Sequence, residues 1–411
     1  MNARSPKAKK SDVLIVGAGP LGWSCAQLLA AQGISTLIVD PNISDNTPLW
    51  ATQGLGIFWP SLNDPPTRAV VAHGLDMAVW LQNFCRLGSE SSGDFFHKAA
   101  LRKIRCVRLG LASHEVRELN QAYTLNLGLK AAESSAGAQF FEESFPAFLV
   151  DETNTRDAFS MRRLKDLGHC RERVVSITEG KDGCTVLLGN NQSHECEIVI
   201  LANGYQIAEL VPWVKEMLVP MSDVYSEWSS NLACPDHCEP LAVRTASGHV
   251  AALFIPQASA QGHGYTWTVR LTGPRFLLPS AGAGVDLSGN PVSDSLSEKI
   301  NEWLRTSFLP VMTQVLQTSH PAEGIKLKLN RARFGVDCLP CDELPILGEL
   351  GSQGRILAST GWLGCGWSAS LQAASVMCEL IEKGSSPRLA GLLKPSRWRS
   401  GMSEDGVTGM T

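Results

Sequence analysis

The stretch that decides the fold spans residues 13–40 and reads VLIVGAGPLGWSCAQLLAAQGISTLIVD. Its apolar opening, residues 13–16, is typical of a strand buried inside a parallel sheet. Three glycines follow in G-x-G-x-x-G spacing, and the Ala- and Leu-rich residues 21–31 predict a helix that ends at Gly33. Residues 34–39 predict a second strand. The order strand, glycine turn, helix and strand predicts a dinucleotide-binding unit.

Each position of this motif has a physical role in binding a dinucleotide. Gly17 permits the tight turn, Gly19 lets a pyrophosphate approach the backbone, and Gly22 lets the helix pack closely on the strand. The helix N-terminus offers N–H groups and a positive dipole end to the phosphates. Asp40 lies where a carboxylate accepts hydrogen bonds from ribose hydroxyls, which disfavours the 2′-phosphate of NADP. The motif alone leaves NAD and FAD both open.

Length and composition limit the class of protein. A chain of 411 residues is too long for one compact core and predicts two domains. The net charge of -4 at pH 7 argues against a nucleic-acid binder, which carries a basic patch or stripe. Residues 1–10 are basic and resemble the start of a signal peptide, but the glycine motif follows at once, so we expect a flexible end instead. The sequence contains no run of 18 apolar residues of the kind that spans a membrane.

The 12 cysteines are scattered along the chain. Without a secretory signal, reduced thiols in a cytoplasmic enzyme are the expected state. Two close pairs, Cys234 with Cys238 and Cys338 with Cys341, leave a four-thiolate zinc site open as an alternative. Because the pairs lie about a hundred residues apart and the first spacing is irregular, we predict no metal site.

Later segments separate NAD from FAD. The sequence predicts a hairpin at residues 173–190 and a buried strand at 194–205. It then predicts paired strands at 250–257 and 265–273, a helix at 293–318 and a terminal strand–turn–helix unit at 355–384. We expect Pro310 to break or kink the helix. The buried strand and the terminal unit look like parts of the first sheet. A cofactor domain assembled from the first, middle and last thirds of a chain is typical of flavoproteins.

Two further stretches carry a family resemblance. Residues 50–60 read WATQGLGIFWP, and residues 331–374 read RARFGVDCLPCDELPILGELGSQGRILASTGWLGCGWSASLQAA. Together with the N-terminal motif, the chain resembles the D-amino-acid oxidase superfamily, which includes glycine oxidase and sarcosine oxidase. The matching pattern is Gly335, Asp342, Pro345 and Gly348, followed by a strand and a glycine-rich turn. The resemblance is vague between residues 61 and 169.

The resemblance implies an α/β fold with a Rossmann-like FAD-binding domain and a discontinuous substrate domain built on a mostly antiparallel sheet. The expected FAD-binding domain comprises residues 11–60, 151–215 and 331–384. The expected substrate domain comprises residues 61–150 and 216–330. Residues 1–10 and 385–411 are expected to be flexible tails.

The resemblance also implies the residues that hold FAD. The ADP half would contact Gly17, Gly19, Pro20, Leu21, Gly22 and Asp40. Gly54 and Leu55 would run past the flavin, and Val174 would touch the adenine through its backbone. The pyrimidine edge of the ring would face Gly361, Leu363, Gly364, Cys365, Gly366 and Trp367, whose N–H groups would stabilise the negative charge of the reduced flavin. Some relatives attach FAD covalently through a Cys where this chain has Gly335, so noncovalent FAD is expected.

The reaction implied is oxidation of a C–N bond: a neutral amine or amino acid delivers hydride to flavin N5 and becomes an imine. Oxygen or another acceptor would take the electrons. The family commonly has an Arg for the substrate carboxylate where this chain has Asp337. Either the substrate lacks that carboxylate, or Arg270, Arg331 or Arg333 takes over. His263, Tyr265 and Trp267 share strand parity and are expected to line an aromatic pocket. Two alternatives stay open: a specialised flavoenzyme acting on a biosynthetic-pathway intermediate, and a flavin-binding subunit of a larger oxidase.

Overall fold

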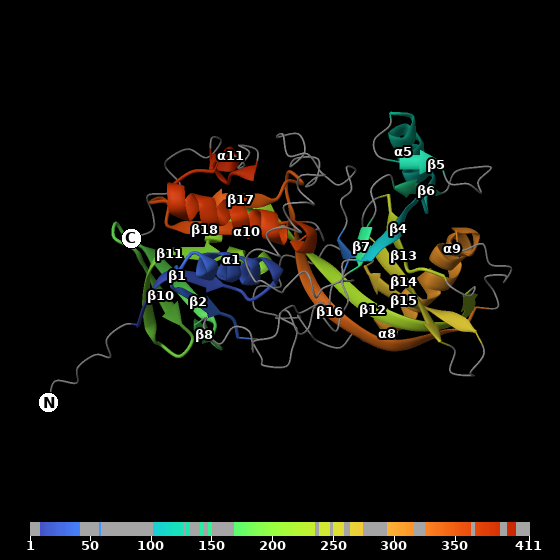
Figure 1. Cartoon of the computed structure of the whole chain (residues 1–411), viewed down its shortest axis with the longest axis horizontal. Helices are drawn as coiled ribbons and strands as arrows, with labels where there is room; N and C mark the ends of the chain where they lie inside the picture. The colour runs from blue at the N-terminus through green and yellow to red at the C-terminus, as the bar shows by residue number, and fades with distance from the viewer. Residues whose placement is uncertain are drawn as a thin grey trace.

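The structure is a computed structural model of the 411-residue chain. It describes residues 9–41, 57–58, 102–125, 129–131, 140–143, 147–149, 168–234, 238–246, 250–258, 264–273, 294–315, 325–362, 366–386 and 393–399. These residues form two sheets that lie on either side of a central region in Figure 1.

The first sheet is the one that the glycine motif predicts. Its main path runs β17–β18–β11–β1–β2–β8, and an antiparallel hairpin of β9 and β10 pairs with β11. Strands β18, β11, β1, β2 and β8 are mutually parallel. The strands are β1 (Lys9–Val16), β2 (Thr36–Val39), β8 (Gly168–Cys170), β9 (Val174–Glu179), β10 (Cys184–Leu188), β11 (Ser193–Leu201), β17 (Ile346–Glu349) and β18 (Ile356–Thr360).

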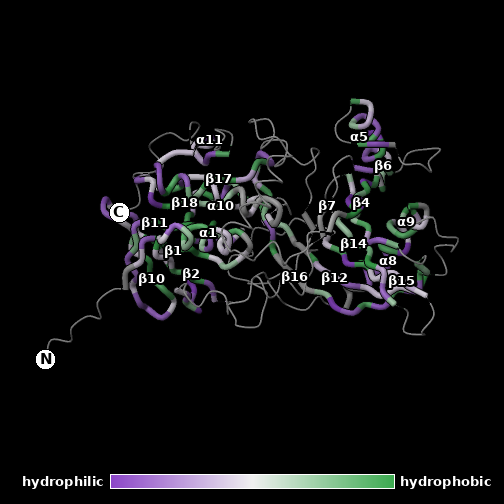
Figure 2. The backbone as a smooth tube through the Cα atoms, in the orientation of Figure 1, coloured by the Kyte–Doolittle hydropathy of each residue, from purple (hydrophilic) through white to green (hydrophobic). Residues whose placement is uncertain are grey.

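Strand alternation divides the core of this sheet into two layers. Val13 and Ile15 face helices α1 (Pro20–Ala31) and α10 (Gly366–Lys383), which pack against each other in one hydrophobic cluster. Leu14 and Val16 face the β9–β10 hairpin and the short helices η2 (Gly204–Gln206), α7 (Ile207–Leu210) and η3 (Pro212–Met217). Because both faces are covered, the strands read as continuous apolar runs, and Figure 2 shows green segments concentrated in them.

The second sheet has the order β16–β12–β15–β14–β13–β4–β6–β5, and β7 pairs with both β4 and β3. Its pairs are antiparallel except β13 with β4. The strands are β3 (Ile57–Phe58), β4 (Arg102–Leu109), β5 (Leu129–Ala131), β6 (Phe140–Glu143), β7 (Ala147–Leu149), β12 (Leu218–Cys234), β13 (Leu241–Thr245), β14 (Ala251–Ala258), β15 (Tyr265–Thr272) and β16 (Leu327–Pro340). The predicted fold class is confirmed by the combination of this sheet with the parallel one.

Helices pack against both faces of the second sheet. Helix α5 (Ser113–Thr124) packs beside β4, β5 and β6. The predicted helix at residues 293–318 is helical in three pieces: α8 (Asp294–Trp303), a π-helical turn (Leu304–Phe308) and α9 (Leu309–Val315). Pro310 is the second residue of α9, and the π-helical turn ends directly before α9, so the irregular part of this helix immediately precedes the proline. Val224, Trp228 and Trp267 face these pieces in one core cluster. Phe140 of β6 belongs to the same cluster with α8 and α9, whereas the next residue, Phe141, packs with Leu119 of α5 on the other face.

Three observations concern residues at the expected domain boundaries. Strand β16 pairs with β12 along its whole length, so residues 331–340 belong to the second sheet. Lys9 and Lys10, expected in the N-terminal tail, already pair with β11. Part of the expected C-terminal tail is folded, because Leu393 is 2% exposed and α11 (Ser396–Arg399) follows it.

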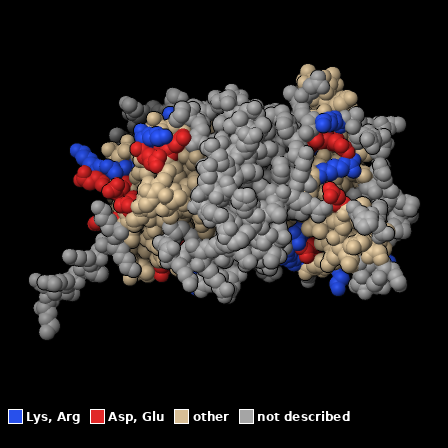
Figure 3. Space-filling view, in the orientation of Figure 1, with Lys and Arg blue, Asp and Glu red and all other residues tan. Residues whose placement is uncertain are grey.

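Surface charge is mixed on the face that Figure 3 shows. Blue and red side chains lie next to each other at both ends of the described surface. Within the described residues, no helix combines the length and hydropathy that a membrane crossing requires.

Candidate functional site

The carboxyl ends of four parallel strands bring Gly17, Asp40, Asn203 and Gly361 to one edge of the first sheet. The chain leaves β1 through α1 to β2 on one side, whereas β11 lies on the other side of β1. The order therefore reverses between β1 and β11, and a ligand of an open α/β sheet binds at such a switch point.

The turn after β1 uses glycine because its backbone demands it. Gly17 has φ +98°, a conformation that side chains strongly disfavour, and a Cβ there would lie 2.7 Å from the Ala202 carbonyl oxygen. Its N–H donates to the Val39 carbonyl at 2.9 Å. The next N–H, of Ala18, donates to Asp40 Oδ2 at 2.8 Å. Asp40 is thus fixed beside the turn.

The other two glycines of the motif have different surroundings. A Cβ on Gly22 would lie 2.0 Å from the Gly17 carbonyl oxygen, so Gly22 is required for packing. A Cβ on Gly19 would meet nothing within 4 Å, so that side of the turn is open. Gly19 precedes α1 with no side-chain cap, and Pro20 is the first helical residue. An open backbone beside a 12-residue helix N-terminus fits a pyrophosphate.

Asn203 is a residue that the sequence reasoning missed. It follows β11, and its Cα would lie 2.9 Å from a Cβ on Gly17. Its Oδ1 atom is buried and accepts no hydrogen bond in the structure. A buried amide oxygen without a donor is costly, and a ligand hydroxyl at this edge would satisfy it. The ending LANG of the predicted strand was the available signal.

Other predicted cofactor contacts lie around the same sheet. Val174 begins β9 and is 5% exposed. Leu21, 8% exposed, belongs to the core cluster beneath α1. Gly361 has φ +74° and lies against Pro340, whose Cγ would be 2.4 Å from an added Cβ. Gly366 is the first residue of α10.

Some predicted residues cannot be assigned a place. Gly54, Leu55, His263, Leu363, Gly364 and Cys365 lie outside the described residues. Trp367 lies in the first turn of α10, but its side chain is also outside the description. For all the predicted cofactor residues, contact with FAD stays a prediction.

The second sheet carries a polar cluster on the face opposite α8 and α9. Its register aligns one residue from each of six strands in a single row: Cys106, Ala242, Leu253, Arg270, Glu227 and Arg331. Half of the row is apolar and half is charged. Tyr225, two residues before Glu227 on the same strand face, is 1% exposed and packs with the apolar half.

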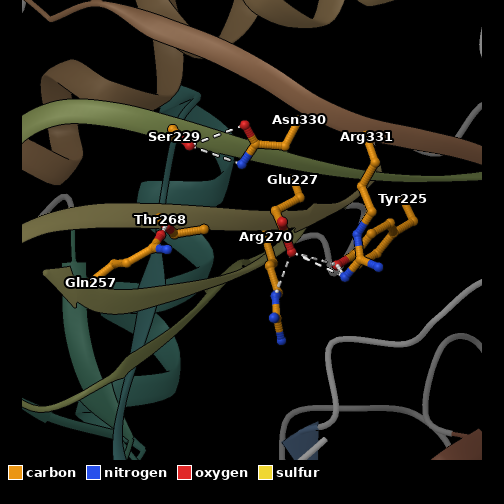
Figure 4. A network of polar contacts seen from close by, with 8 residues as sticks. All are labelled: Tyr225, Glu227, Ser229, Gln257, Thr268, Arg270, Asn330 and Arg331. Carbon is orange, nitrogen blue, oxygen red and sulfur yellow. Dashed lines mark hydrogen bonds and ion pairs between the residues drawn. The ribbon is translucent and has the colours of Figure 1, made fainter. Parts of the chain in front are cut away.

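The charged half converges on one oxygen atom, as Figure 4 shows. Glu227 Oε2 accepts hydrogen bonds from Arg270 Nε at 2.9 Å, Arg331 Nη2 at 3.1 Å and the Tyr225 hydroxyl at 3.4 Å. Arg331 Nη2 also donates to the Tyr225 oxygen at 3.1 Å, and its guanidinium lies 5.3 Å from the ring centre. We call Tyr225, Glu227, Arg270 and Arg331 the Glu227 cluster.

Electrostatics keeps this cluster charged. Burial raises the pKa of Glu227, but Arg270 and Arg331 outweigh burial, so the net pKa is lowered. Burial lowers the pKa of Arg331, and Tyr225 and Glu227 reverse this to a net rise. Burial raises the pKa of Tyr225 to about 12. At neutral pH the cluster therefore holds a carboxylate, two guanidinium groups and a neutral phenol.

The structure separates Arg331 from Asp337. Both lie on β16 with the same parity, six residues or roughly 20 Å of extended strand apart. Asp337 Oδ1 accepts a hydrogen bond from the N–H of Cys338 at 2.8 Å. Arg270 and Arg331 are engaged with Glu227 rather than placed at position 337. The side chain of Arg333 is outside the description.

The expected aromatic pocket on β15 needs a correction. Trp267 is 2% exposed and belongs to the core cluster beneath α8 and α9. Strand alternation therefore points Trp267 toward the helices and Arg270 toward the opposite face. Tyr265, at the start of β15, is 45% exposed. Trp267 therefore lies in the core rather than in a pocket, and a role of His263 and Tyr265 in binding the substrate stays a prediction.

A clamp fixes the loop between β16 and β17. Arg397 donates from Nε to Asp342 Oδ2 at 2.6 Å and from Nη2 to Oδ1 at 3.1 Å. Trp398 Nε1 donates to Asp342 Oδ2 at 2.9 Å. Burial raises the pKa of Asp342, but these donors and the Leu344 N–H outweigh burial and lower it.

The cysteine pairs are not assembled into a metal centre among the residues described, which include no group of three or more His, Cys, Asp or Glu side chains that could hold an ion. Cys338 is 1% exposed, and its Sγ lies 3.2 Å from Thr360 Oγ1. Burial raises its pKa to about 12.

The glycine turn, Asp40 and the place of both at the switch point are typical of an α/β sheet that binds a dinucleotide. Residues 12–380 match the family model for FAD dependent oxidoreductases abbreviated DAO, and the chain belongs to this family. The expected resemblance is therefore confirmed, and the family's cofactor is FAD.

Solved structures support the same fold. Glycine oxidase from Geobacillus kaustophilus is 15% identical, with TM-score 0.66 over 94% of this chain and 98% of that chain. Iminodiacetate oxidase from Chelativorans sp. BNC1 is 14% identical, with TM-score 0.64 over 93% and 98%. L-proline dehydrogenase from P. horikoshii is 13% identical, with TM-score 0.61 over 96% and 99%. At these identities the likeness concerns the fold.

Proposed function

We propose that this flavoenzyme oxidises the C–N bond of an amine or amino acid, transferring hydride to flavin N5 and leaving an imine that water hydrolyses. When bound, FAD supplies the two-electron acceptor. The fold neighbours named for glycine, iminodiacetate and L-proline support a nitrogen-bearing substrate. The single observation that carries the proposal is a combination in this family member. One sheet has an edge that would bind a dinucleotide, and the other sheet has a face with charged and polar side chains.

The chain's own residues divide the work of binding. Gly17 and Gly19 would bring the backbone against the pyrophosphate, and Asp40 would hold a ribose hydroxyl. Asn203 would accept a further hydrogen bond from the cofactor. Gly335 has no thiol, which supports noncovalent FAD, because a thioether to the flavin needs a cysteine sulfur. The substrate would lie against the face of β12, β15 and β16.

A second candidate keeps the fold and changes the substrate. Asp337 would repel a substrate carboxylate at a position where an Arg would attract it. This favours an amine without a free carboxylate there, such as an intermediate of a biosynthetic pathway. The described cysteines form no disulfide with one another, which supports a reducing compartment such as the cytoplasm.

Anaerobic flavin reduction tests the proposal. The purified holoprotein is mixed with a panel of amines and amino acids, and loss of the oxidised flavin absorbance is followed. We expect at least one amine class to reduce the flavin. Reduction by no member of a broad panel would contradict amine oxidation and would favour a flavin-binding subunit that works only within a larger oxidase.

An Asp337→Arg variant separates the two candidates. An arginine there would bind a carboxylate through two hydrogen bonds and repel a cationic amine. If Asp337 faces the substrate, the variant's flavin should be reduced faster by amino acids and more slowly by amines than the wild-type flavin is. An unchanged order of substrates would place Asp337 away from the bound substrate.

A further inference from the structure

The Glu227 cluster is a carboxylate-binding arrangement whose carboxylate belongs to the protein. Two guanidinium groups and one phenol donate to Glu227 Oε2 over 2.9 to 3.4 Å. Charged donors of this kind bind the carboxylates of ligands strongly and with defined geometry. Here the carboxylate lies on β12, and the two guanidinium groups lie on the neighbouring strands β15 and β16.

The cluster is placed where a ligand can meet it. It lies on the sheet face turned away from α8 and α9, beside the buried Leu253 in the same row. The Glu227, Arg270 and Arg331 side chains keep 16%, 15% and 29% of their surfaces exposed. The charges are thus partly desolvated but reachable from the face that the proposed function assigns to the substrate.

We propose that Glu227 is a specificity-determining residue: its carboxylate occupies the guanidinium donors of this face, so the enzyme accepts amines that lack a free carboxylate and rejects α-amino acids. This inference rests on the proposed amine oxidation. A substrate carboxylate would have to displace Glu227 from Arg270 and Arg331. Either the substrate carboxylate or that of Glu227 would then lack its guanidinium partners in a partly buried environment, which is costly.

A purely structural ion pair across three strands would have the same geometry but a different response to substitution. Cross-strand pairs of opposite charge stabilise sheets without any ligand. A structural pair predicts only a loss of stability when Glu227 is truncated. A pair that occupies a ligand's place predicts, in addition, that substrates with a carboxylate gain over substrates without one when the charge of Glu227 is removed.

Glu227→Ala tests whether the donors bind an external carboxylate, with the flavin-loaded holoprotein as the sample and acetate as the probe. Truncation leaves space and two guanidinium groups, so we expect acetate at millimolar concentration to raise the melting temperature of the variant. The wild type should show no such rise, because its own carboxylate fills the place. Chloride at equal ionic strength separates specific binding from salt screening.

Glu227→Gln provides a second readout that does not depend on a cavity. The amide keeps the shape and removes the negative charge. We expect the ratio of flavin reduction rates, phenylalanine over phenethylamine, to rise at least about tenfold, since a charged hydrogen bond is worth roughly 1.5 to 3 kcal/mol. These two compounds differ only in the carboxylate.

Asn330→Ala is the matched control, because Asn330 bonds Ser229 across the same two strands without touching the Glu227 cluster. This variant should have the same melting-temperature response to acetate and the same ratio of flavin reduction rates as the wild type. The inference is overturned if acetate shifts wild type and Glu227→Ala equally or neither of them, or if the Glu227→Gln ratio stays unchanged. Failure of all amines to reduce the wild-type flavin would instead count against the proposed function, while the acetate result still stands.

Discussion

The two sheets of this molecule build their sites in different ways. At the edge of the parallel sheet, the proposed cofactor contacts of Gly17 and Gly19 are made by the backbone, Gly22 allows close packing, and Asp40 and Asn203 are the described residues whose side chains would take part. On the second sheet, the Glu227 cluster consists of side chains held by cross-strand register. A site formed by backbone atoms requires positions that have no side chain, whereas a site formed by side chains depends on which strands become neighbours in the sheet.

The largest expected effect separates two glycines at the parallel-sheet edge. Gly22→Ala puts a Cβ 2.0 Å from the Gly17 carbonyl oxygen. Alanine gains about 1 kcal/mol of helix propensity, but the backbone clash costs more, so we expect a net loss of about 3 kcal/mol in the free energy of unfolding. Urea unfolding of the apoprotein measures it.

Gly19→Ala is the matched variant. An added Cβ there meets no atom within 4 Å, so we expect a stability loss below about 1 kcal/mol and a marked loss of FAD affinity. Fluorescence titration of the apoprotein with FAD measures the affinity. Equal effects of both variants on stability would show that the two glycines do not have the separate roles that their surroundings indicate.

The next effect concerns the loop where the two sheets meet. Arg397→Ala removes two hydrogen bonds from Asp342, and we expect a loss of roughly 2 kcal/mol at pH 7. The pKa of Asp342 is lowered in the folded state, so its stabilising contribution is present above its unfolded pKa and is lost as the pH falls through the folded value. The difference between wild type and variant should therefore shrink as the pH falls below about 4, the ordinary pKa of an Asp side chain. Urea unfolding from pH 7 to pH 2.5 tests this, and a difference independent of pH would contradict it.

The smallest effect concerns the acid stability of the Glu227 cluster. Because the net pKa of Glu227 is lowered, its contribution is present above the unfolded pKa and is lost as the pH falls through the folded pKa. We expect Glu227→Gln to cost about 1 kcal/mol at pH 7 and less below about pH 4. Thermal unfolding across this range checks it, with Asn330→Ala as the variant whose difference from wild type stays constant.

The sequence predicted the first sheet well because local pattern determines it. The apolar runs around the glycine turn and the 173–190 hairpin appear as β1, β2, β9 and β10. The paired strands at 250–257 and 265–273 appear as β14 and β15. Each of these features depends on residues within one stretch of chain.

The second site was not predictable in the same way. Glu227 meets Arg270 and Arg331 only after β12 has been placed between β15 and β16, and no local pattern states this neighbourhood. The same reason explains Trp267, whose strand face was fixed by helices that follow it in the chain. Asn203 was overlooked because a polar residue after a buried strand resembles an ordinary turn.

The ribbon formed by β12 and β16 has a mechanical consequence. The two strands remain paired from Leu218 with Pro340 to Ser230 with Leu327, a length of roughly 40 Å. Figure 1 shows this ribbon extending from beside the parallel sheet to the far end of the second sheet. Such a ladder resists bending far more than a single connecting loop does. Pro340 lies at the end of this ribbon against Gly361, so β16 connects the segment that pairs with Glu227 to the edge of the parallel sheet.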